Sequence, residues 1–242
     1  AGISALAAAL VIGRRKDSDI TEFVPNNIPL VVLGAALLWF GWFGFNGGSA
    51  LAANTLAITA LVVTNIAAAS AAISWMAVDW ISKGKPSTVG LAIGAVCGLV
   101  AITPASGYVT VPSAIIIGLI AGIVSNFVAN WRSSRTKLDD SLDVFACHGV
   151  SGIWGSLATG LFATVSINST GPNGLFYGNP KLLLIQLLAV GVVIVFSFTG
   201  SYLLLKLIGL FTDIRVSPED EERGLDRSLH GERAYVGEGL AD

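Results

Sequence analysis

Residues 23–78 read FVPNNIPLVVLGAALLWFGWFGFNGGSALAANTLAITALVVTNIAAASAAISWMAV and contain no Asp, Glu, Lys or Arg. A helix needs about 20 apolar residues to cross the hydrocarbon core of a bilayer, so this stretch is long enough for two crossings. A polar, glycine-containing turn between Asn46 and Asn54 divides it. The stretch therefore predicts two membrane-spanning helices joined by a short loop.

The remainder of the chain repeats this pattern, with further uncharged runs at 86–131, 144–180 and 182–205. A membrane β-barrel would show alternating polarity over about 10 residues, whereas these runs are continuously apolar. The sequence thus predicts an all-α, polytopic membrane helix bundle. Six full helices are expected at 27–46, 55–81, 88–105, 110–131, 141–165 and 181–211, with a partial one at 1–13. Gly94/Gly98 and Gly118/Gly122 predict close helix packing.

The composition excludes several classes of protein. Of 242 residues, 53% are hydrophobic and only 12% are charged, with a net charge of −2. A soluble domain carries about 25% charged residues, and a nucleic-acid binder needs a basic surface. Cys97 and Cys147 lie in apolar runs and are expected to pack as small hydrophobic side chains. No metal site and no cofactor is expected.

Basic residues alternate between the predicted loops. The loops after the first, third and fifth helices carry Arg14, Arg15, Lys16, Lys83, Lys85, Arg132, Arg135 and Lys137. By the positive-inside rule these loops face the cytoplasm. Residues 212–242 contain nine acidic residues and four Arg. We therefore expect a membrane domain at 1–211 and a cytoplasmic tail at 212–242.

One face of the second predicted helix could bind a small cation. Leu38, Trp42, Phe45 and Ser49 are spaced i, i+4, i+7 and i+11, which places them on one side of a helix. Cation–π attraction contributes about 2 kcal/mol in a desolvated site. The alternative is ordinary packing together with an aromatic belt at the membrane interface.

Two ionisable side chains lie within predicted helices. Asp79, near the end of the third helix and beside Lys83, is expected to cap the helix or to reach the interface. His148 follows Asp140 by eight residues, or about 12 Å along a helix, and Val144 shares its face. An ionisable residue inside a membrane is a candidate functional group. A histidine that is merely satisfied within the core is the alternative.

Three acids, Asp139, Asp140 and Asp143, are expected in the first turn of the sixth helix. Negative charge there interacts favourably with the positive end of the helix dipole. The pattern favours a structural role for these acids.

Four motifs together carry a family resemblance: Gly41–Ser49 (GWFGFNGGS), Thr103–Gly107 (TPASG), Asp140–Gly152 (DSLDVFACHGVSG) and Gly224–Glu232 (GLDRSLHGE). The chain resembles the Amt/Mep/Rh ammonium transporters, on the Amt side, along its whole length. It looks like the C-terminal half of such a protein, beginning within the fifth of eleven helices of an inverted-repeat transporter.

The resemblance implies transport of ammonium rather than enzymatic catalysis. Ser49 would belong to the outer ammonium site, with Trp42 and Phe45 below it. His148 would be the second of two pore histidines, the first of which would precede Ala1. Leu38 and Val144 would line the apolar pore.

The resemblance also implies partners and a location. The family forms homotrimers in the plasma membrane, and a PII signalling protein docks on the cytoplasmic face. The expected regulatory residues of the tail are Gly224, Leu225, Asp226, His230 and Gly231. An ammonium sensor that signals through the tail is the alternative function, and a gas channel of the Rh type is favoured less.

Overall fold

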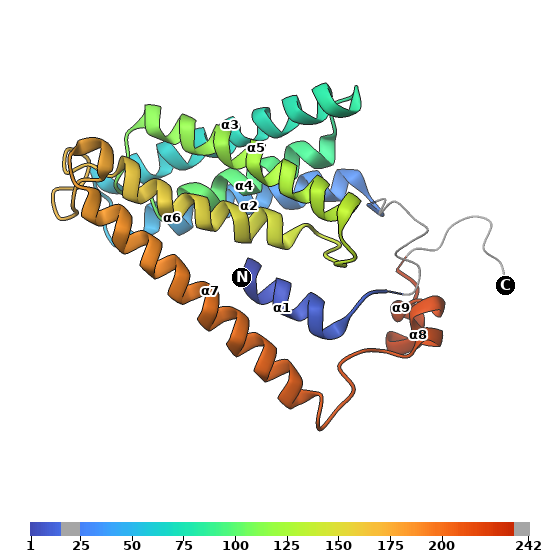
Figure 1. Ribbon diagram of the computed structural model, residues 1–242. Helices are drawn as coiled ribbons and strands as arrows, with labels where there is room; N and C mark the ends of the chain where they lie inside the picture. The colour runs from blue at the N-terminus through green and yellow to red at the C-terminus, as the bar shows by residue number, and fades with distance from the viewer. Residues whose placement is uncertain (16–24, 235–242) are drawn as a thin grey trace.

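The computed structural model describes residues 1–15 and 25–234, and every regular element in these ranges is helical (Figure 1). In chain order the elements are α1 (Gly2–Ile12), α2 (Ile28–Gly48), α3 (Thr55–Lys83), α4 (Thr88–Ile102), α5 (Val111–Arg135), the π-helical turn η1 (Phe145–Val150), α6 (Ser151–Phe162), the 3₁₀ turn η2 (Leu175–Tyr177), α7 (Pro180–Ile208), α8 (Pro218–Arg223) and α9 (Leu225–His230).

The all-α prediction is confirmed. Four helices, α2, α3, α5 and α7, are long and apolar enough to cross a membrane, while α1 and α4 are shorter apolar helices. Most predicted ends agree with the structure within four residues. The predicted helix at 141–165 also agrees within four residues, with its regular part from Phe145 to Phe162, but it begins as the π-helical turn η1. The number of crossings and the eleven-helix repeat stay predictions.

Side-chain caps mark where the helices begin. Asn27 and Asn54 each accept a hydrogen bond from a backbone N–H in the first turn of α2 and α3, and Ser87 does the same for α4. Such caps satisfy amide groups that have no partner within the helix. At its other end, α3 stops at Gly84, whose φ of 77° lies in the left-handed region.

The core lies where α4 and α5 pack on α3. A Cβ on Gly98 of α4 would lie 2.7 Å from Cα of Ala68, and one on Gly118 of α5 would lie 2.9 Å from Cα of Ala67. The glycines therefore allow helix backbones to touch, as the small-residue spacing predicts. Fully buried apolar side chains such as Ile102 fill the remaining space.

α6 packs against α4 and α5 and contributes to the same core, whereas α1 and α7 lie beside this bundle, with α1 between η1 and α7 (Figure 1). A Cβ on Gly2 would overlap the backbone of Gly149, so α1 starts directly against η1. No residue of α7 is buried, and Phe40 of α2 is 75% exposed. Apolar faces of this size need lipid or another protein surface to cover them.

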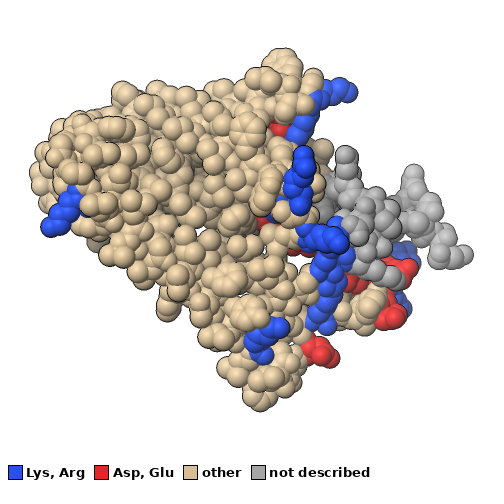
Figure 2. Space-filling view, in the orientation of Figure 1, with Lys and Arg blue, Asp and Glu red and all other residues tan. Residues whose placement is uncertain are grey.

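Basic side chains gather mainly at one end of the molecule (Figure 2). We call this end the basic end and define it by Arg14, Arg15, Lys83, Lys85, Arg132, Arg135 and Lys137, which lie near the ends of α1, α3 and α5. The tail helices α8 and α9 lie at the same end (Figure 1). Of the predicted basic and acidic segments, Lys16 and residues 235–242 fall outside the described residues.

Candidate functional site

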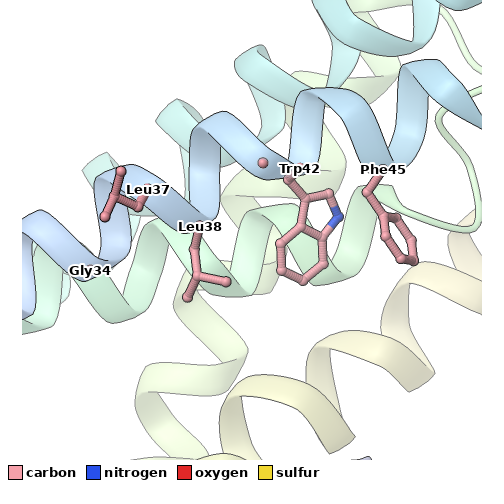
Figure 3. A pocket seen from close by; sticks show the side chains of 6 residues that line it. Gly34, Leu37, Leu38, Trp42 and Phe45 are labelled. Carbon is pink, nitrogen blue, oxygen red and sulfur yellow. The ribbon is translucent and has the colours of Figure 1, made fainter.

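Three of the four residues predicted on the second helix line one depression. Leu38, Trp42 and Phe45 project to the same side of α2 (Figure 3). The depression has a volume of about 580 Å³, and its other lining residues are Gly34, Leu37 and Gly41. The ring centroids of Trp42 and Phe45 lie 5.8 Å apart with planes tilted by 51°, within the range of favourable aromatic pairs. The spacing therefore predicted this shared face correctly.

Hydrogen bonds fix the polar parts of this face. The indole Nε1 of Trp42 donates to Oγ1 of Thr103 at 2.7 Å. Ser49, at the C-terminal end of α2, donates its hydroxyl to the carbonyl of Phe45 at 2.6 Å. The serine oxygen still has lone pairs that can accept a hydrogen bond from a cationic donor. Sequence reasoning missed the part played by Thr103, although it singled out the motif that contains this residue.

His148 lies in η1, half-buried, beside a different cavity. This cavity has a volume of about 280 Å³, lies between α1, η1, α6 and α7, and includes the polar side chains of Ser156, Gln186 and Ser197. Its lining does not include Leu38, Trp42 or Phe45. The described residues thus form two separate surfaces. A π-helical turn often marks a functional position, and His148 lies within one.

The prediction that three acids occupy the first helical turn is wrong. All three precede the regular helix, because the backbone turns at Asp143, where φ is 52°. Only Asp140 caps the helix: its two carboxylate oxygens accept the backbone N–H groups of Val144 and Phe145 at 2.9 and 2.8 Å. Asp140 is 8% exposed. It therefore holds the turn that carries His148.

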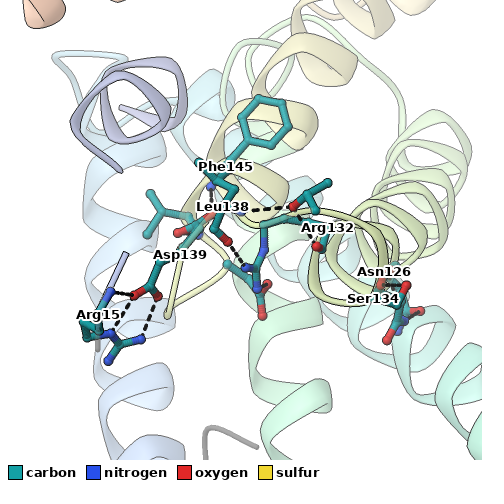
Figure 4. Close-up of polar contacts among 12 residues, drawn as sticks. Arg15, Asn126, Arg132, Ser134, Leu138, Asp139 and Phe145 are labelled. Carbon is teal, nitrogen blue, oxygen red and sulfur yellow. Dashed lines mark hydrogen bonds and ion pairs between the residues drawn. The ribbon is translucent and has the colours of Figure 1, made fainter. Parts of the chain in front are cut away.

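The other two acids form ion pairs with arginines at the basic end, and Figure 4 shows the pair of Arg15 and Asp139. Asp139 receives the Nε and Nη2 groups of Arg15, each at 2.8 Å, while Asp143 receives Nη2 of Arg132 at 2.9 Å. The hydrogen bond from the Arg15 guanidinium lowers the pKa of Asp139, although burial of the carboxyl opposes this effect. These pairs join α1 and α5 to the loop before η1.

Asp79 is buried near the C-terminal end of α3, with 1% of the residue exposed. Its carboxylate accepts hydrogen bonds from Nε1 of Trp75 at 3.1 Å and Nδ2 of Asn126 at 2.9 Å. Nζ of Lys83 lies 2.8 Å from Oδ1 of Asp79. The i−4 and i+4 positions of Trp75 and Lys83 could have indicated this cluster, but the contribution of α5 could not be read from the sequence.

The predicted regulatory residues of the tail lie in and around α9, which forms a compact helical pair with α8. Gly224, with φ of 91°, separates α8 from α9, which begins at Leu225 and ends with His230 before Gly231, with φ of 68°. The carboxylate of Asp226 accepts hydrogen bonds from the backbone N–H groups of Arg227 and Ala234. The second of these bonds is the main reason that the pKa of Asp226 is lowered.

Arg215 connects this pair to the membrane helices. Its Nη1 donates to the carbonyl of Ile12, the last residue of α1, at 3.1 Å. Its Nη2 forms an ion pair with Glu221 of α8 at 2.8 Å. The tail is therefore attached to α1 at the basic end.

Long apolar helices, close glycine contacts and buried polar side chains define a multi-pass membrane protein. A model of the Ammonium Transporter Family matches residues 1–235, and the chain belongs to this family. It is 50% identical over 235 residues to the ammonium transporter Amt1 of Archaeoglobus fulgidus, covering 97% of this chain and 59% of that protein. It is 46% identical to the ammonium transporter of Bacillus subtilis, covering 57% of it.

Solved structures give the same result. Candida albicans Mep2 matches with a TM-score of 0.84 and 37% identity, covering 90% of this chain and 50% of that chain. A structure called Sensor Amt Protein matches with a TM-score of 0.83 and 36% identity, covering 93% and 56%. The chain thus spans about half the length of these relatives. The curated relatives are named as transporters, in agreement with the expectation that the protein is not an enzyme.

Proposed function

We propose that this chain contributes to ammonium transport across a membrane. The observation that carries the proposal is the shared face of Leu38, Trp42 and Phe45, ending at the hydroxyl of Ser49, in a chain 50% identical to a named ammonium transporter. In this proposal Ser49, Trp42 and Phe45 recruit ammonium. Leu38, together with the more distant Val144 and His148, lines the path that follows.

The energetics favour loss of a proton before the apolar part of the path. A bare cation at the centre of a bilayer costs from about 3 to more than 10 kcal/mol. With Lys as a proxy for ammonium, a pKa near 10.4 makes deprotonation at pH 7 cost about 4–5 kcal/mol. Deprotonation therefore competes with passage of the ion, and it discriminates against K⁺, which has no proton to lose. The imidazole of His148 would then hydrogen-bond the neutral ammonia.

The test uses the full parent transporter in liposomes. An ammonium pulse should produce a transient current, or an internal pH change if neutral ammonia alone crosses, and a K⁺ pulse should produce neither. His148→Ala should reduce the ammonium flux or weaken its selectivity over K⁺. A variant with unchanged flux and selectivity would refute the role of His148, and a parent protein that moves no ammonium would refute transport.

An ammonium sensor is the second candidate, favoured by the similarity to the structure called Sensor Amt Protein. A sensor would bind ammonium at the α2 face and pass the signal to the tail. Ammonium binding without flux in the liposome assay would support it.

We further propose that the basic end faces the cytoplasm of a plasma-membrane protein that forms homotrimers. The tail residues Gly224, Leu225, Asp226, His230 and Gly231 would then help to dock a PII-type protein. The support is the excess of basic residues at this end together with the ordered tail helices α8 and α9. Truncation of the parent at Thr212 should weaken inhibition by PII, and normal inhibition would contradict this role.

A further inference from the structure

A cavity with charged and polar side chains on its wall opens at the basic end of the bundle. It has a volume of about 850 Å³ and lies between the start of α2, the end of α3, the start of α4 and the end of α5. Asp79 and Lys83 are on its wall, together with the neutral polar side chains of Ser87, Asn130 and Ser133. Arg15, Arg132 and Asp143 also line it, and the two arginines form ion pairs with Asp139 and Asp143. None of these residues belongs to the α2 face or to the His148 cavity described above.

The contacts of the Asp79 carboxylate are of two kinds. Trp75 and Asn126 donate neutral N–H groups and hold the carboxylate in place, but they do not balance its charge. Within residues 1–15 and 25–234, the one ion pair of Asp79 is with Lys83. The side chain of Asp79 is 1% exposed, whereas that of Lys83 is 52% exposed. The ammonium group of Lys83 can therefore swing toward solvent, while the carboxylate of Asp79 stays in place.

Close packing of α4 preserves the position of this carboxylate. A Cβ on Gly90 would overlap Oδ2 of Asp79 and would lie 2.7 Å from Nε1 of Trp75. Gly90 also lines the cavity. The carboxylate is thus oriented by Trp75 of α3, Asn126 of α5 and the backbone of α4 at Gly90. Its position does not depend on Lys83.

We propose that Asp79 is a binding site for ammonium at the basic end, where the substrate competes with the side chain of Lys83. The Nζ group of Lys83 is a primary ammonium that donates to Oδ1 of Asp79 at 2.8 Å, and free ammonium offers the same charge and donors. The cavity wall supplies further oxygen acceptors on serine and asparagine side chains. An ion pair with one exposed partner contributes little to stability, and ionisable groups inside membrane proteins commonly serve function.

The inference deepens the proposed function by adding a site on the path of the same substrate. Displacement of Lys83 by ammonium costs no net charge, because one ammonium group replaces another. Since the tethered lysine is always present at a high effective concentration, binding to the unaltered site is weak and release is easy. Removal of the lysine side chain should expose a tighter site.

The test is thermal unfolding of the purified parent protein in NH₄Cl and in KCl at equal ionic strength. Lys83→Met should be stabilised by NH₄⁺ in a saturable manner, with a half-saturating concentration at least about fivefold lower than in the unaltered protein. The double variant Asp79→Asn/Lys83→Met is the matched control. It should lose the tighter response that Lys83→Met adds, and should keep only the response of the unaltered α2 face. Lys83→Gln, which keeps a neutral donor at this position, gives a second test if the methionine variant does not fold.

Three results would overturn the proposal: no ammonium-dependent stabilisation of the Lys83 variants, equal stabilisation by K⁺, or the same response in the double variant. The binding readout does not require transport. Absence of ammonium flux in liposomes would therefore refute the proposed function. The Asp79 site would still be judged by the ammonium-dependent shift in melting temperature alone.

Discussion

Replacement of Asp140 by Asn tests whether this carboxylate holds the turn that carries His148. The substitution keeps the size of the side chain. In the native structure both carboxylate oxygens are used, one by the N–H of Val144 and one by the N–H of Phe145. An amide has only one oxygen, so one backbone N–H must face an NH₂ group in a site that is 8% exposed.

The magnitude follows from these two bonds. A hydrogen bond to a charged group contributes about 1.5–3 kcal/mol, and a buried donor without a partner costs about 1–3 kcal/mol. We therefore expect Asp140→Asn to lower the free energy of unfolding by about 2–4 kcal/mol. At about 2–4 °C per kcal/mol for a protein of this size, the melting temperature should fall by roughly 5–15 °C.

The assay is thermal unfolding of the purified parent protein, with ammonium flux measured on the same preparation. Asp213→Asn is the matched control, since it makes the same chemical change at an exposed position of the tail. The ammonium flux through Asp140→Asn should also be lower than that of the parent at temperatures where the variant is still folded. The reason is that the turn that carries His148 is no longer fixed. A melting temperature within about 1 °C of that of the Asp213 control would refute the capping role, on the same scale of degrees per kcal/mol.

Two further predictions concern helix packing and pH. Gly98→Ala should destabilise the protein by about 1–3 kcal/mol, because the added Cβ would lie 2.7 Å from Cα of Ala68. Gly191→Ala, where no atom lies within 4 Å of the new Cβ, should be neutral or slightly stabilising in the same unfolding assay, and equal losses in the two variants would contradict the packing argument. Because pairing with Arg15 lowers the pKa of Asp139, the stability that this pair adds should be complete above about pH 4 and should be lost as the pH falls through the lowered pKa. Asp139→Asn should remove this acid-dependent part from the plot of melting temperature against pH, and an unchanged plot would show that the pair does not contribute.

The sequence by itself determined the class of the protein and most of its helices. Uncharged runs specify helices in a membrane because a spanning backbone must satisfy its own hydrogen bonds, and this requirement is local to each segment. The spacing of Leu38, Trp42 and Phe45 likewise fixed a shared face, because helical periodicity depends only on neighbours in the chain. The motifs were sufficient to indicate the family to which the chain belongs.

Only the tertiary structure decided which partners each polar residue has. Asp140 caps a π-helical turn, and Asp139 pairs with an arginine 124 positions away in the chain. Asp79 is enclosed by α3, α4 and α5, and Asn126, one of its partners, comes from α5. Such contacts depend on how separate helices meet, which is set by glycine positions and packing across the whole bundle rather than by any one segment. Sequence periodicity can place a residue on a face, but it does not specify the partners that other helices bring to that face.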